Sequence, residues 1–154
     1  AIQANDLVGR KTARDGGQSA RAIAEQIAKT EADLHASGTA AALSMARHLQ
    51  TAREAFLQTV DFVAGKAKAS PNAVYAGSVP YLMLTGNLVA GWQMGRALLV
   101  AQDKLAAGEE AAFMQAKIIT AQFYAEHILT RVPGLAHTVC TGGESACALP
   151  LEAF

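Results

Sequence analysis

The chain has 154 residues and a formal net charge of zero, with 13 basic and 13 acidic side chains. This length suits one domain with a core of useful size. The balanced charge argues against a nucleic-acid partner, because neutralising many phosphates requires a basic excess. Alanine, the best helix former, occupies 34 positions, whereas valine, isoleucine and threonine are sparse, so an all-α fold is expected.

The first half of the chain predicts three helices. A short amphipathic helix is expected over residues 2–13, and Asp15 with Gln18 has the spacing of a capping box at the start of the next helix. That second helix is predicted over 17–36, with Gly38 ending it in the left-handed conformation. Its predicted buried stripe consists of Ile23, Ile27 and Leu34.

The third helix is predicted over residues 39–69, because apolar side chains recur there at steps of three and four residues. The predicted buried residues are Leu49, Phe56, Val60, Val63 and Ala67.

The second half predicts two further long helices. Ser70 followed by Pro71 is a helix start, and Pro80 is expected to kink or break the helix over 71–107 between Gly77 and Pro80. The last long helix opens at Glu109 and Glu110, and Pro133 and Gly134 are expected to kink or end it. Residues 144–154 are expected to form a tail. The predicted buried stripe of the last helix is Met114, Ile118, Ala121, Ala125, Ile128 and Val132.

Short connections between long amphipathic helices force neighbours to run antiparallel. The predicted fold is therefore an up-down-up-down four-helix bundle preceded by a short N-terminal helix.

Residues 69–95 contain no charged side chain and no histidine, so by length alone this segment is a candidate membrane span. Its several polar groups and Pro80 favour a buried helix in a soluble bundle instead. Gly91 and Gly95 lie one turn apart, which indicates a close approach to another helix, and Trp92 is expected at a packed or inter-domain surface.

Patterns that carry chemistry are missing from the sequence. A di-metal bundle site needs Glu-x-x-His pairs, and the nearest approach, Glu31 with His35, is one residue too far apart. His137, Cys140 and Cys147 match no standard zinc spacing. We therefore predict no metal site and no catalytic residue. The two cysteines are interpreted as reduced thiols of a cytoplasmic protein.

Two stretches resemble acyl-CoA dehydrogenases of the large bacterial type. Residues 2–11 (IQANDLVGRK) are similar to a run that in this family directly follows the motif Tyr-Glu-Gly-Thr, whose Glu is the usual catalytic base. Residues 81–82, 91–92 and 123–129 resemble the extra C-terminal helical domain of these enzymes. The resemblance covers most of the chain.

The resemblance implies that residues 1–14 are the tail of the parent enzyme's catalytic helical domain and that 15–154 are its C-terminal bundle domain. The parent would be an FAD-dependent oxidoreductase of fatty-acid metabolism that dehydrogenates acyl-CoA thioesters and passes electrons to electron-transfer flavoprotein. The fragment itself would be catalytically inert and hold no cofactor. Gln3 is implied to lie near the adenosine side of FAD in the parent.

The partners implied are the catalytic body of the same polypeptide and its homo-oligomer. Two other functions stay open from the sequence: a free-standing helical scaffold or adaptor, and a membrane-associated helical module.

Overall fold

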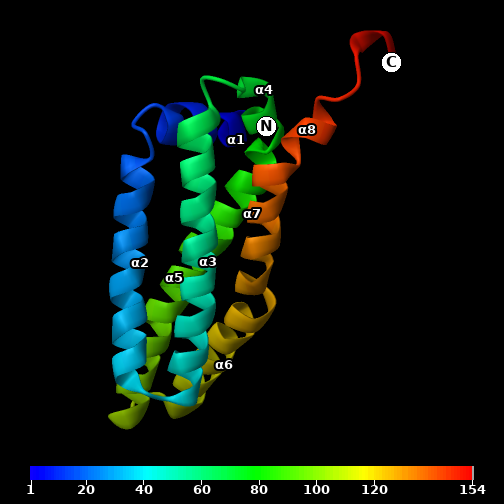
Figure 1. Cartoon of the computed structure of the whole chain (residues 1–154). Coiled ribbons are helices and arrows are strands. Elements are labelled where there is room, and N and C mark those ends of the chain that lie inside the picture. Colours follow the sequence, from blue (N-terminus) through cyan, green and yellow to red (C-terminus); the bar gives the residue numbers. More distant parts are fainter. Residues whose placement is uncertain (154) are drawn as a thin grey trace.

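Four long helical stretches run alternately up and down in the computed structural model (Figure 1). They are α2 (Gln18–Ser37), α3 (Ala40–Lys66), α5 (Ser78–Ala106), and α6 (Ala111–His127) continued by α7 (Val132–Thr141). The structure describes residues 1–153, apart from the side chain of Leu151, and these residues contain no β-strand. The predicted all-α bundle is confirmed.

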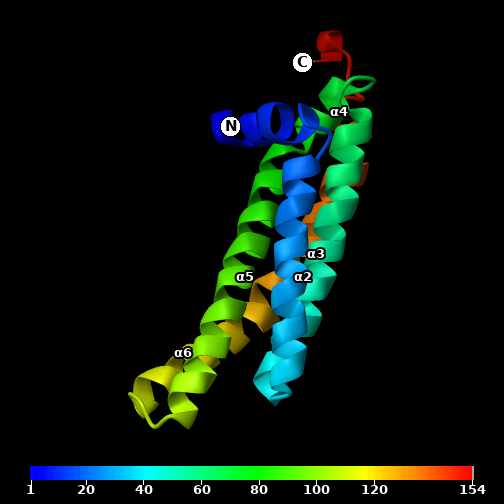
Figure 2. The ribbon, with the colours of Figure 1, turned by 90° about the vertical axis from the view of Figure 1, so that its left-hand side faces the viewer.

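The short N-terminal helix lies across one end of the bundle. It consists of α1 (Ile2–Asp6) and the wider π-helical turns η1 (Leu7–Ala13), and Figure 2 shows it roughly perpendicular to the long helices. Its extent matches the predicted range of 2–13. It packs against the start of α5 and the end of α3, and these contacts set the position of the N-terminus relative to the bundle.

Glycine and proline set the breaks between helices as predicted. Gly38 separates α2 from α3 with a φ of 69°, and Pro71 begins the short helix α4 (Pro71–Ala76). Gly77 then separates α4 from α5, and Pro80 lies in the first turn of α5, where a proline costs no intrahelical hydrogen bond. The predicted break between Gly77 and Pro80 is confirmed. The third helix ends at Lys66, three residues before the predicted end.

The last helix differs more from its prediction. It begins at Ala111, after Glu110 in a left-handed conformation, and it breaks at His127 rather than at Pro133. Pro133 instead lies in the first turn of α7, and its ring would clash with the carbonyl of Leu129, so residues Leu129–Arg131 tighten into a 3₁₀ turn, η2. The predicted tail is partly wrong, since α8 (Gly143–Ala146) and a turn, η3 (Leu151–Ala153), lie there.

The core lies between the long helices. The predicted stripe of α3 is buried except for the half-buried Ala67, and the stripe of the last helix is buried except for the half-buried Ile128. The prediction for Ile23 was wrong, because that side chain is 39% exposed. Its neighbour Ala24 is buried in its place, at 3% exposed.

Asp15 holds the start of α2. Its carboxylate accepts hydrogen bonds from the backbone N–H groups of Gly17 and Ser19, each at 2.9 Å. Asp15 therefore accepts from the backbone as predicted, but α2 begins at Gln18 itself, so the reciprocal half of a capping box cannot form there. Hydrogen bonds from Ser19, its hydroxyl first, lower the pKa of Asp15 below its usual value of 3.8.

The lowered pKa predicts a dependence of stability on acid. The ionised Asp15 carboxylate stabilises the folded protein fully at pH values above the pKa that Asp15 has in the unfolded chain. This stabilisation is lost as the pH falls from that value through the lower pKa of Asp15 in the folded protein. We expect the stability advantage of the wild type over Asp15→Asn to shrink below about pH 4. Urea unfolding of both proteins at neutral pH and at acid pH measures this, and an equal difference at both values would contradict it.

Candidate functional site: an apolar face on α5 and α6

Tyr81 fastens the N-terminal helix to the bundle. Its hydroxyl shares a buried hydrogen bond of 2.9 Å with the hydroxyl of Thr12, and its ring stacks on Phe56 with centroids 6.3 Å apart. Burial raises the pKa of Tyr81, so its hydroxyl stays protonated at neutral pH. This contact joins η1 to α5 and α3 and so positions the residues that precede it.

Tyr81→Phe should lower the free energy of unfolding by about 1 kcal/mol, because it removes one buried hydrogen bond and leaves the ring in place. Tyr75→Phe is the matched control, since Tyr75 is an exposed aromatic residue beside the same segment. We expect the control to change stability by less than about 0.5 kcal/mol. Thermal unfolding of both variants makes the comparison, and equal effects would show that the Thr12 bond contributes nothing.

Gln3, the one residue predicted near a cofactor, is exposed on α1. It borders an open hollow of about 360 Å³ together with Leu82 of α5 and residues of the N-terminal helix. Arg10 and Lys11 line the same hollow, and Arg10 pairs with Asp6 at 3.2 Å. The Asp6 carboxylate lines the hollow too and offsets one of the two cations, so these residues fit only an edge contact with the adenosine diphosphate part of a dinucleotide.

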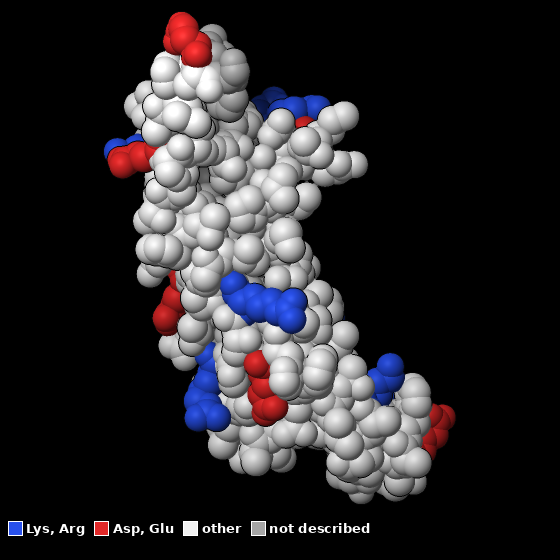
Figure 3. All heavy atoms as spheres, turned by 90° about the vertical axis from the view of Figure 1, so that its right-hand side faces the viewer, with Lys and Arg blue, Asp and Glu red and all other residues white. Residues whose placement is uncertain are grey.

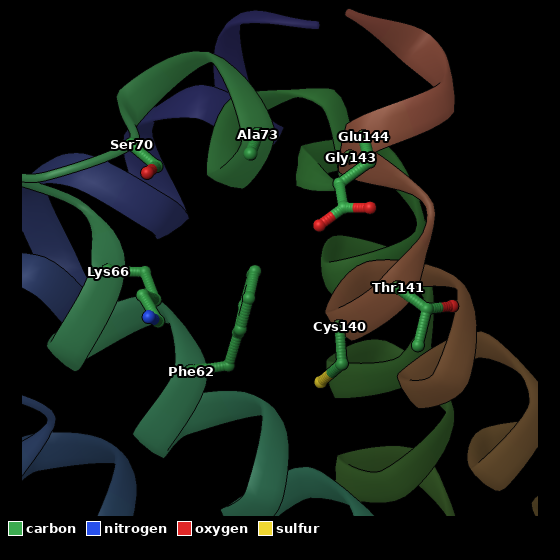
Figure 4. A pocket seen from close by; sticks show the side chains of 8 residues that line it. All are labelled: Phe62, Lys66, Ser70, Ala73, Cys140, Thr141, Gly143 and Glu144. Carbon is green, nitrogen blue, oxygen red and sulfur yellow. The ribbon is translucent and has the colours of Figure 1, made fainter. Parts of the chain in front are cut away.

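A second hollow of about 410 Å³ lies where α3, α4, α7 and α8 meet (Figure 4). Lys66 and Glu144 lie on opposite sides of it, and Cys140 borders it. Burial raises the pKa of the Cys140 thiol, which keeps it protonated and a poor nucleophile. His137, Cys140 and Cys147 belong to no group of metal-ligating side chains, since within residues 1–153 no three such side chains gather.

Polar contacts between the helices were not predicted from the sequence. Glu31 of α2 makes a bidentate ion pair with Arg53 of α3, at 2.8 and 2.9 Å. The indole N–H of Trp92 on α5 donates to the hydroxyl of Thr30 at 2.8 Å. The burial of Glu31 could have been predicted from its spacing, because Glu31 lies four residues after Ile27 and three before Leu34, on the core-facing side of α2.

Gly91 and Gly95 are buried in close contact with other helices, as predicted. A Cβ atom at Gly91 would lie 2.5 Å from Leu129 Cδ2, and one at Gly95 would lie 3.2 Å from Leu34 Cδ1. Trp92 is half-buried, which agrees with its predicted place at a packed surface.

The outer sides of α5 and α6 carry most of the large apolar side chains that are exposed. Among the side chains that the structure describes, seven of the twelve exposed large hydrophobic ones lie on these two helices, whereas α2 and α3 expose two. The seven are Val79, Leu82, Met83, Val100, Phe113, Ile119 and Phe123. Figure 3 views the side of α6 and α7, where charged side chains form only small separate groups among uncharged atoms. Such a concentration of exposed apolar groups is typical of an interaction surface.

A membrane span was the other interpretation of the uncharged segment. None of the helices described over residues 1–153 combines the length and the apolar character that crossing a membrane requires.

Comparison with known proteins identifies the family. Residues 22–150 match the family described as acetyl-CoA dehydrogenase C-terminal like. The chain is 49% identical over 145 residues to the 3-methylmercaptopropionyl-CoA dehydrogenase of Ruegeria pomeroyi, a match that covers 94% of this chain and 24% of that protein. It is 33% identical over 145 residues to the broad-specificity linear acyl-CoA dehydrogenase FadE5 of Mycobacterium tuberculosis, covering 84% of this chain and 22% of that protein.

The chain thus spans about a quarter of the length of the curated relatives it matches. The family match covers most of the bundle and agrees with the resemblance found in the sequence. The chain belongs to the family of acyl-CoA dehydrogenase C-terminal domains.

Proposed function

We propose that this chain is the accessory helical domain of a larger FAD-dependent acyl-CoA dehydrogenase, and that it packs on the catalytic body instead of catalysing a reaction itself. The observation that carries the proposal is the 49% identity to an acyl-CoA dehydrogenase over 94% of the chain. In this proposal residues 1–14 are the end of the catalytic helical domain and residues 15–154 are the accessory bundle.

The proposed division gives each part a different role. The catalytic base and the substrate pocket belong to the body, which precedes residue 1, and FAD bound there would accept a hydride from the acyl-CoA thioester. This chain contributes the edge residues Gln3, Arg10 and Lys11, whose amide and cations suit the adenosine diphosphate part of FAD. Tyr81 holds these residues in place through Thr12.

The partners of the whole protein follow from the same proposal. They are an acyl-CoA substrate, electron-transfer flavoprotein as electron acceptor, and further copies of the enzyme in a homo-oligomer. The proposed location is the cytoplasm.

The test compares the 154-residue chain with the whole protein encoded around it. We expect the whole protein to carry one FAD per chain and to reduce an electron acceptor when acyl-CoA is added. The 154-residue chain should be helical and colourless, because the flavin is bound mainly by the body. Stoichiometric FAD in the short chain, or acyl-CoA-dependent reduction by it, would refute the proposed role.

A further inference from the structure

We propose that the exposed stripe along α5 is the surface on which the polypeptide preceding residue 1 docks in the whole protein. This inference rests on the proposed function and names the contact surface within it. The residues of this α5 stripe are Val79, Met83, Gly86, Ala90, Gln93 and Ala97.

The stripe faces outwards, yet all its members except Gln93, which accepts a hydrogen bond from Arg96, are apolar or lack a side chain. Its members recur at three- and four-residue steps, so they lie on one side of the helix. Val79 and Met83 are about half exposed, at 50% and 54%, and Gly86 leaves the helix backbone open to contact. Residues 79–95 carry no charge, whereas a solvent-facing helix side is normally polar.

α2 shows the contrast within the same bundle. Its outward positions include Glu25, Lys29 and Asp33, all exposed. A helix that stays in contact with water therefore carries charges in this protein. The difference between the two helices indicates that the α5 stripe is covered in the whole protein.

α6 extends the apolar surface beyond α5. The two helices pack side by side, and a hollow of about 440 Å³ between them is lined by apolar side chains such as Val100 and Phe113. Three basic side chains also line this hollow, those of Arg96, Lys104 and Lys117. Phe123 of α6 is 57% exposed and stacks on His127 with ring centroids 4.4 Å apart. The occupant of the α5 stripe thus meets an apolar surface that is wider than one helix.

The position of the N-terminus indicates which polypeptide covers the stripe. The N-terminal helix runs past Leu82 of α5, and Ile2 is 83% exposed at its free end. Figure 2 shows this end projecting to the side of the bundle on which α5 lies. Polypeptide that precedes residue 1 therefore begins beside the stripe. In the two relatives, about three quarters of the chain lies outside the matched region, which is enough for a body of several domains.

The shape of this side favours the body over a second copy of the bundle. The N-terminal helix at one end and the turn between α5 and α6 at the other both extend towards the same side, which leaves α5 between two projections (Figure 2). A symmetric pair would have to bring this same side of both copies together, with both projections of each copy accommodated by the other. A covalently linked partner is also present at high effective concentration.

The test uses Met83→Glu and the control Ile23→Glu, which places the same charge at an exposed apolar position of α2. In the 154-residue chain both variants should melt like the wild type, because both sites face water. In the whole protein, a protease that cuts between the body and the bundle should separate the two about tenfold faster, or more, in Met83→Glu than in the wild type. The reason is that a buried unpaired charge weakens the contact between them. Ile23→Glu should leave the release rate unchanged.

The outcomes separate this inference from the proposed function. A wild-type whole protein with FAD and activity but equal release rates for the two variants would overturn the docking surface alone. A whole protein without FAD would overturn the proposed function, whatever the variants do. A third outcome would also overturn the inference. If the 154-residue chain forms a dimer that Met83→Glu abolishes, and the variant leaves the release rate in the whole protein unchanged, the α5 stripe binds a second copy.

Discussion

Gly91→Leu should destabilise the bundle by about 2–3 kcal/mol, in the upper part of the usual range for overpacking a core. The first added atom, Cβ, would already lie 2.5 Å from Leu129 Cδ2, and the rest of the side chain would have to enter the same filled space. Leu129 lies in the 3₁₀ turn between α6 and α7, so relief requires this turn to move away from α5. The gain in helix propensity of leucine over glycine, somewhat under 1 kcal/mol, offsets only part of this cost.

Gly86→Leu is the matched control, because Gly86 lies on the same helix and a Cβ there meets no atom within 4 Å. The control should keep or slightly raise the stability of the 154-residue chain, since only helix propensity changes. Chemical unfolding at equilibrium measures both variants. If Gly91→Leu had the same unfolding midpoint as the wild type, the close contact between α5 and Leu129 would be refuted.

Glu31→Ala should cost about 3 kcal/mol, the lower end of the range for breaking a buried ion pair. The side chains of Glu31 and Arg53 are only 8% and 18% exposed, and the guanidinium donates two hydrogen bonds to the carboxylate. Removing Glu31 leaves the Arg53 charge between α2 and α3 without its partner. The loss of stability arises from the unpaired Arg53 charge rather than from the strength of the ion pair itself.

Glu25→Ala provides the control for this prediction, since Glu25 is exposed on the same helix and makes no ion pair within residues 1–153. We expect it to change stability by less than about 0.5 kcal/mol. The double variant Glu31→Ala with Arg53→Met should recover much of the loss, because no buried charge then remains. Similar unfolding midpoints for Glu31→Ala and Glu25→Ala would contradict the role of the pair.

The number and order of the long helical stretches and most of their ends were predictable because glycine and proline mark them locally. Gly38, Pro71 and Gly77 each act through the backbone of their own residue or its neighbours. The break before Pro133 was placed too late, because the clash of a proline ring falls one turn upstream of the proline itself. The burial of Ile23 was predicted wrongly because the alanine-rich sequence of α2 leaves its buried side ambiguous, and Ala24 is buried instead.

The candidate surface was harder to predict than the fold. The uncharged segment over 69–95 was visible in the sequence, and so was the close contact expected of Gly91. The sequence did not reveal that Val79 and Met83 face outwards while Gly91 is buried, because that depends on where the other helices pack against α5. The Glu31–Arg53 pair was missed for the same reason, since its partners are joined only by the packing of two helices.

Hydrogen exchange of the backbone amides of α5 shows directly whether the α5 stripe is covered in the whole protein. It would be measured in the whole protein and in the 154-residue chain under the same conditions. A covered α5 stripe predicts that the amides from Met83 to Ala90 exchange more slowly in the whole protein, because docking suppresses local opening of the helix. Amides of α2, whose outer side carries exposed charges, should exchange equally in both. Equal exchange of the α5 amides in the two proteins would show that the α5 stripe is not covered.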